Sequence, residues 1–130
     1  MSILFGPAAL KIVRGATWSD NITMTDLSTG LPVNLTGVVS IIMRVRPTYD
    51  GILLLEASTT AGSILIVNAT GGIIGIRVGS AITNSAFPAN NYRKAKYVYD
   101  VLIQRTAGEY EPAIKGKLTV YPSVTQAIGP

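Results

Sequence analysis

Residues 38–46 read VVSIIMRVR, and this run indicates the architecture more clearly than any other part of the chain. Apolar side chains recur at every second position here, and β-branched residues suit extended backbone. Successive side chains of a strand point to opposite faces of the sheet, so the run predicts a half-buried strand. Its core face would carry Val39, Ile41, Met43 and Val45, and its other face Ser40, Ile42, Arg44 and Arg46.

The same alternation recurs near the C-terminus. Residues 96–105 read KYVYDVLIQR, with Tyr97, Tyr99, Val101 and Ile103 on one face. Earlier in the chain, the paired glycines Gly71 and Gly72 separate two β-rich runs and predict a hairpin, because glycine reaches the backbone angles of tight turns.

Further β-rich segments are spaced by turn residues about every ten positions. Strands are expected at residues 9–13, 17–26, 52–57, 63–68, 73–78 and 113–121, and turns at 26–30, 47–51 and 106–112. A helical period is absent except for one short turn expected at residues 80–86. The pattern predicts an all-β fold, a single antiparallel β-sandwich with immunoglobulin-like layering.

The domain organisation follows from the length of 130 residues, which suits one core. We expect an extended N-terminal arm at residues 1–8, the sandwich at 9–121 and a C-terminal tail at 122–130. The arm carries an apolar cluster, Ile3, Leu4 and Phe5, which is predicted to pack on another molecule. The N-terminus has no basic leader, and no apolar run approaches the ~20 residues of a membrane span.

The composition argues against catalysis and against a cofactor. The chain has no histidine and no cysteine, which removes the commonest general base and the usual zinc ligands. Most of the seven carboxylates fall in or beside expected turns; Asp100 lies within a strand and is expected to face a basic residue of a neighbouring strand. Trp18 is expected to anchor the core, with an interface role as the alternative.

Charge is scarce, at 14% of residues against 48% apolar residues, and the net charge is +4. A surface so poor in charge is simplest to explain if neighbouring subunits cover part of it. The basic residues Arg93, Lys94 and Lys96 lie among tyrosines. We favour an acidic patch on an adjacent subunit as their partner; a solvated loop or a single-stranded nucleic acid are the alternatives.

Several short motifs occur in a fixed order: RGATW at 14–18, DLSTGLPVNLTG at 26–37, LLE at 54–56, IIGIRV at 73–78, AFPANNY at 86–92, YVYDV at 97–101, GKLTV at 116–120 and PSVT at 122–125. With these motifs in this order, the chain resembles small β-sandwich domains of tailed-bacteriophage virions over about residues 10 to 125. Such domains include the N-terminal domains of baseplate upper proteins and related tail and decoration modules. Such domains usually pass from a Pro-x-Gly turn straight into a Tyr-rich strand, whereas here Asn90 and Asn91 fill the turn and residues 93–96 are inserted.

The resemblance implies a non-enzymatic structural protein of a virion assembled in the host cytoplasm, with sister copies and other virion proteins as partners. A tail, baseplate or fibre-attachment component is the favoured interpretation, and a head decoration protein on the capsid is the alternative. A glycan- or nucleic-acid-binding module is the rival from a different class, with Tyr92, Tyr110, Glu109 and Glu111 as candidate glycan contacts. No membrane, small-molecule substrate, metal or cofactor is expected.

Overall fold

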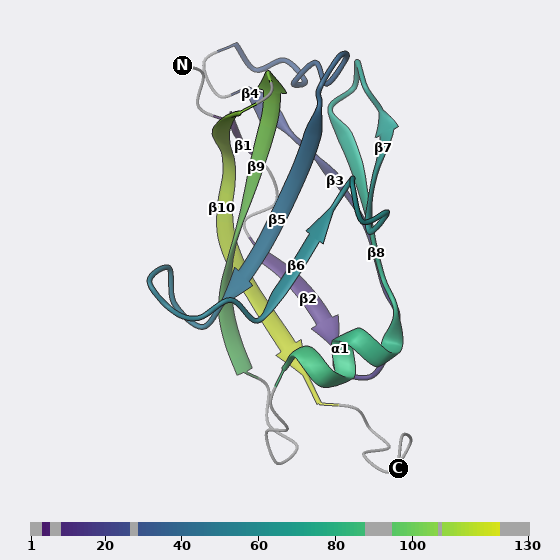
Figure 1. Ribbon diagram of the computed structural model, residues 1–130, viewed down its shortest axis with the longest axis vertical. Helices are drawn as coiled ribbons and strands as arrows, with labels where there is room; N and C mark the ends of the chain where they lie inside the picture. The colour runs from purple at the N-terminus through teal and green to yellow at the C-terminus, as the bar shows by residue number, and fades with distance from the viewer. Residues whose placement is uncertain (1–3, 6–8, 27–28, 88–94, 107, 123–130) are drawn as a thin grey trace.

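The chain folds as an all-β sandwich of immunoglobulin-like layering, as the sequence predicts (Figure 1). The computed structural model describes residues 4–5, 9–26, 29–87, 95–106 and 108–122. The larger layer is a five-stranded sheet of β2 (Ala9–Val13), β10 (Glu109–Tyr121), β9 (Ala95–Thr106), β5 (Ser40–Arg46) and β6 (Leu55–Ser58), in that order. The smaller layer is a three-stranded sheet of β3 (Trp18–Thr23), β8 (Ile73–Val78) and β7 (Ile64–Asn68).

The N-terminal part of the chain contributes to both sides of the sandwich. β1 (Leu4–Phe5) pairs antiparallel with β4 (Thr25–Asp26), which follows β3, whereas β2 joins the five-stranded sheet and pairs parallel with β10. The other strand pairs in the described ranges are antiparallel. Of the arm expected at residues 1–8, Leu4 and Phe5 are therefore paired with their own chain. Ile3 and most of the expected C-terminal tail, residues 123–130, lie outside the described residues.

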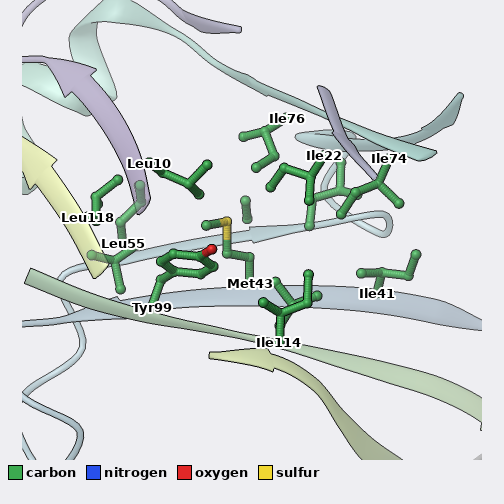
Figure 2. Packing of buried hydrophobic residues seen from close by; sticks show 14 of the residues in the cluster. Leu10, Ile22, Ile41, Met43, Leu55, Ile74, Ile76, Tyr99, Ile114 and Leu118 are labelled. Atoms are coloured by element: carbon green, nitrogen blue, oxygen red, sulfur yellow. The ribbon is translucent and has the colours of Figure 1, made fainter. Parts of the chain in front are cut away.

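The core lies where the two sheets face each other. The alternation predicted for residues 96–105 is confirmed, because Tyr97, Tyr99, Val101 and Ile103 are all buried. Figure 2 shows Ile22, Ile74 and Ile76 of the three-stranded sheet opposite Ile41, Met43 and Tyr99 of the five-stranded sheet. Burying each aliphatic side chain of this size contributes roughly 1.5–3 kcal/mol, so these rows supply most of the driving force for folding.

The beginning of β5 departs from the predicted alternation. The pattern places Val39 on the core face, but Val39 is 57% exposed. It precedes the first residue of β5, and its backbone N–H donates to the carbonyl of Gln104 at 2.7 Å. The pattern places Ser40 on the outer face, but Ser40 is buried, with its hydroxyl 2.7 Å from Gln104 Oε1. At the end of a sheet, the exposure of a side chain depends more on how near its residue lies to the end of the strand than on the alternation of the two faces.

The predicted hairpin between β7 and β8 is confirmed. Gly72 adopts a φ of 68°, and a Cβ at this position would lie 2.6 Å from the Met24 carbonyl oxygen. The Gly72 carbonyl in turn accepts the Met24 N–H at 2.8 Å, so the hairpin end packs directly against the chain that follows β3. Only glycine permits this approach.

Several boundaries differ from the prediction, and the strand expected at residues 17–26 is divided into β3 and β4. The turn expected at residues 106–112 is much shorter, since β10 begins at Glu109. Pro112 lies inside the strand, beside a register shift between Pro112 and Ile114, because a bulge accommodates a residue that cannot donate to the ladder. The strand expected at 52–57 begins only at Leu55, which leaves Ile52 72% exposed.

The short helix expected at residues 80–86 is confirmed as α1 (Ser80–Ala86). Thr83 attaches it to the β2–β3 turn. The buried Thr83 hydroxyl lies 2.8 Å from the carbonyl oxygen of Ala16 and accepts the N–H of Gly15 at 3.2 Å. Over the described ranges, no helix is long and apolar enough to cross a membrane.

Candidate interaction surfaces

Among the described residues, no group of three or more His, Cys, Asp or Glu side chains is placed to hold a metal ion. Tyr97 and Tyr99 belong to the core. Burial raises the pKa of Tyr97 above its usual value, against the opposing effect of the Arg14 guanidinium. Burial, together with the nearby Tyr49, raises the pKa of Tyr99 to about 12. Both phenols therefore stay neutral and serve packing.

Trp18 is part of the core, which confirms the favoured interpretation. Its side chain is 3% exposed, and its indole N–H donates to Asp20 Oδ2 at 2.8 Å. The hydrogen bond satisfies the one polar atom of a large buried ring. Trp18 is therefore not available as a contact residue for a partner.

The outer face of the five-stranded sheet carries a row of four charged residues from four adjacent strands. In register, Lys115 of β10 faces Asp100 of β9, Asp100 faces Arg44 of β5, and Arg44 faces Glu56 of β6. We call these four residues the charged row. Its signs alternate across the sheet, and Arg44 Nε contacts Glu56 Oε2 at 3.0 Å.

Asp100 occupies the place that the sequence predicts, next to basic residues of neighbouring strands. The register puts it between Arg44 and Lys115. Its Oδ1 atom is nevertheless buried with no hydrogen-bond partner in the described part of the chain. Burying a carboxylate oxygen without a partner is unfavourable, so the charged row contains one unsatisfied acceptor.

An apolar row runs beside the charged row on the same face. Pro112, Leu102 and Ile42 face one another in register across β10, β9 and β5. Leu102 and Ile42 are both partly buried in the isolated chain. The face thus combines a charged stripe with an apolar stripe, a composition common to protein contacts.

The loop between β5 and β6 reaches β10. The Tyr49 hydroxyl donates to the Gly116 carbonyl at 3.3 Å, and Lys115 Nζ lies 5.5 Å from the centroid of the Tyr49 ring. The loop also exposes Ile52 and Leu53. The loop therefore places the Tyr49 ring beside Lys115, at one end of the charged row.

β7 forms one edge of the three-stranded sheet, and among the described strands it pairs only with β8. Its residues Leu65, Ile66 and Val67 are 49%, 39% and 50% exposed. We call these three residues the β7 edge. Three consecutive exposed apolar residues on an edge strand, without a charge among them, invite pairing or packing with another chain. A register shift between Ile66 and Asn68 interrupts the ladder there.

Of the basic residues that the sequence predicts to lie in an interface, the structure describes Lys96. Lys96 lies in β9, exposed, opposite Thr119 of β10. Arg93 and Lys94 fall outside the described residues, as does Ile3 at the N-terminus. The role of the predicted interface residues therefore stays a prediction.

The candidate glycan contacts are partly brought together. Tyr110, Glu109 and Glu111 line an open hollow at the β9–β10 hairpin with Arg105 and Thr106. Arg105 Nε contacts Glu111 Oε1 at 2.9 Å, and Arg105 Nη1 donates to the Asn34 carbonyl at 3.0 Å. Tyr92 lies outside the described residues. Sequence reasoning missed Arg105, because the expected longer turn concealed that its side chain reaches Glu111.

No family model matches the sequence, and no curated protein matches it either. Among solved structures, the chain is similar to murine CRIg, with 12% identity and a TM-score of 0.42 over 95% of this chain and 98% of that one. It is also similar to the periplasmic chaperone SfaE, with 14% identity and a TM-score of 0.43 over 95% of this chain and 57% of the chaperone. Likenesses this weak carry no argument about function.

Proposed function

We propose that this chain is a non-enzymatic structural protein of a tailed-bacteriophage virion that works through contacts between subunits. The observation that supports the proposal best is the β7 edge, where three neighbouring apolar side chains are exposed on a strand without charge. Isolated exposed apolar residues are ordinary, but three consecutive ones on an edge strand favour pairing with another chain.

The composition supports the same proposal. Charged residues make up 14% of the chain, and the β5–β6 loop adds a second exposed apolar site at Ile52 and Leu53. A small domain with so few charges keeps little protection against association. In a particle built from many copies, these surfaces face other subunits rather than water.

The assignment to a virion depends on the ordered sequence motifs and not on the fold, since the sandwich serves many unrelated functions. Within the virion we favour a tail, baseplate or fibre-attachment position, and a head decoration protein is the alternative. The proposed partners are sister copies and other virion proteins.

Particles purified from a lysate of the source host test the proposal. Gold-labelled antibodies against the purified chain are expected to decorate the tail or baseplate in electron micrographs. Decoration of the head would select the alternative. Absence of the chain from particles, checked by mass spectrometry of the same preparation, would contradict the virion role.

A glycan-binding module is the second candidate, and the hollow at the β9–β10 hairpin is the observation that favours it. An exposed tyrosine beside paired charged side chains can stack on a sugar ring and bind its hydroxyls. Glycan-array binding by the purified chain that saturates and disappears in Tyr110→Ala would establish this candidate. Lack of binding on the array would leave the assembly role as the better explanation.

A further inference from the structure

We propose that the outer face of the five-stranded sheet binds a second copy of this chain about a two-fold axis that lies between the two copies and runs along the strands, midway between β9 and β5. The inference rests on the proposed assembly role. It specifies the molecule that binds this face and the symmetry of that contact. Three observations support it: the alternating charged row, the incompletely used Arg44 guanidinium and the apolar row beside them.

The order of charges makes this face complementary to itself. Across β10, β9, β5 and β6 the charged row reads positive, negative, positive, negative. An axis along the strands between β9 and β5 reverses this order in the facing copy. Asp100 then lies opposite Arg44 of the second copy, and Lys115 lies opposite Glu56 of the second copy. Within the charged row, each cation of one copy then faces an anion of the other, and the symmetry repeats both pairs.

A different axis would not do this. If the two-fold axis ran along the charged row instead, each residue would face its own copy, with Asp100 against Asp100 and Arg44 against Arg44. Like charges brought face to face are unfavourable, so the row selects one orientation and rejects the other.

The local chemistry of Arg44 points to a missing partner. Arg44 uses Nε for Glu56, and no further hydrogen bond of its guanidinium is seen there. A guanidinium has five N–H donors, so Arg44 retains donors for a second carboxylate. A second copy brings another cation to Asp100 and another anion to Arg44.

The apolar row fits the same symmetry. The axis places Leu102 opposite Ile42 of the second copy, so partly exposed apolar side chains meet each other. Sheets that pack face to face lie about 10 Å apart with nearly aligned strands, a spacing that long Arg, Lys and Glu side chains can bridge. The face therefore offers both the apolar contact and the charge pairing of a homotypic interface.

Two charge reversals test the contact. Arg44→Asp and Asp100→Arg each place like charges opposite each other in a dimer of identical copies. Each variant alone is expected to self-associate about tenfold or more weakly than the wild type in sedimentation velocity.

An equal mixture of the two variants is expected to restore the contact. In the mixed pair, the two basic side chains of the Asp100→Arg copy face the two acidic side chains of the Arg44→Asp copy, so every charge again meets its opposite. Native mass spectrometry, with one variant labelled with nitrogen-15, is expected to show mixed dimers in excess of either homodimer.

Both reversals put like charges next to each other within the chain, so folding is checked by circular dichroism and thermal melting. The neutral variants Asp100→Asn and Arg44→Gln provide a second test if a reversal does not fold, and each is expected to weaken self-association by a smaller factor. Ser19→Asp adds a charge on the exposed face of the other sheet and is the matched control, expected to associate like the wild type.

The outcomes distinguish the two-fold contact from the proposed function. If folded variants associate as tightly as the wild type, or if the mixture forms no mixed dimer, the two-fold contact is wrong while the assembly role stands on other surfaces. A wild-type chain that stays monomeric yet is found in particles leads to the same conclusion. A wild-type chain that is monomeric and absent from particles overturns both.

Discussion

The two faces of β9 differ in what they contact, since one face packs in the core and the other is partly exposed to solvent. The inner face carries Tyr97, Tyr99, Val101 and Ile103, all buried against the other sheet. The outer face carries Val98, Asp100, Leu102 and Gln104, all of them only partly buried. The inner side chains are fixed by packing density, whereas the outer ones are free to specify a contact.

This contrast separates the residues that hold the fold from the residues that are free to bind. A substitution on the inner face should change the free energy of unfolding and leave the association of folded molecules alone. A substitution on the outer face should do the reverse.

The strongest destabilisation is expected for Ile103→Ala, which empties a fully buried site on the inner face. The loss of packing and the cavity left behind should lower the free energy of unfolding by about 2–5 kcal/mol. Its neighbour Leu102, on the outer face, is the matched control, and Leu102→Ala should cost clearly less. Urea denaturation at low protein concentration measures both. Equal losses would contradict the assignment of the two faces.

A somewhat smaller effect is expected where Gly116 approaches Tyr99. A Cβ at Gly116 would lie 2.7 Å from the Tyr99 ring, so Gly116→Ala should force the ring or the strand to move. Overpacking of this kind costs about 1–3 kcal/mol. Lys115→Ala, one residue away on the exposed face, should change little in the same denaturation experiment. A Gly116→Ala variant as stable as the wild type would show that the ring has room.

The inner face should also respond to high pH. The pKa of Tyr99 is about 12 in the folded chain, against an ordinary value of 10.0. Between these values the unfolded chain loses the proton while the folded chain keeps it, so stability should fall as the pH rises from about 10 to 12. Below pH 10 this contribution is fully present. The fall should be shallower in Tyr99→Phe, measured by thermal melting across that range; identical slopes would contradict the buried phenol.

The weakest effect on stability is expected on the outer face, for Glu56→Gln. The Arg44–Glu56 ion pair is partly exposed to solvent, so its loss should change the free energy of unfolding by less than about 1 kcal/mol. Denaturation of dilute protein measures this change. A loss of several kcal/mol would mean that the charged row supports the fold itself.

Much of the fold can be predicted from periodicity. The alternation of residues 96–105 identifies the buried face of β9, and the glycine pair identifies the β7–β8 hairpin. The pattern misplaces Val39 because exposure at a strand end depends on where the sheet ends, which local sequence does not reveal. It makes the turn before β10 too long because Pro112 is typical of strand ends, whereas here a bulge accommodates it.

The sequence predicts that Asp100 faces a basic residue of a neighbouring strand, but it does not identify the other residues of the charged row. Its four residues come from four strands, and no local pattern relates them. The register shift between Pro112 and Ile114 also sets which β10 residue meets Asp100. Without the shift Ile114 would take that place, and Lys115 would fall opposite Tyr99. A one-residue change in register decides whether the row exists.

Self-association of the wild-type chain is the property on which the two-fold contact depends. Sedimentation velocity over a range of protein concentrations, at low and at high salt, measures it. We expect a sedimentation coefficient that rises with concentration toward that of a dimer and falls back at high salt, because salt screens the facing charges. A coefficient that stays at the monomer value at every concentration and at both salt levels would contradict the claim that this chain associates with itself.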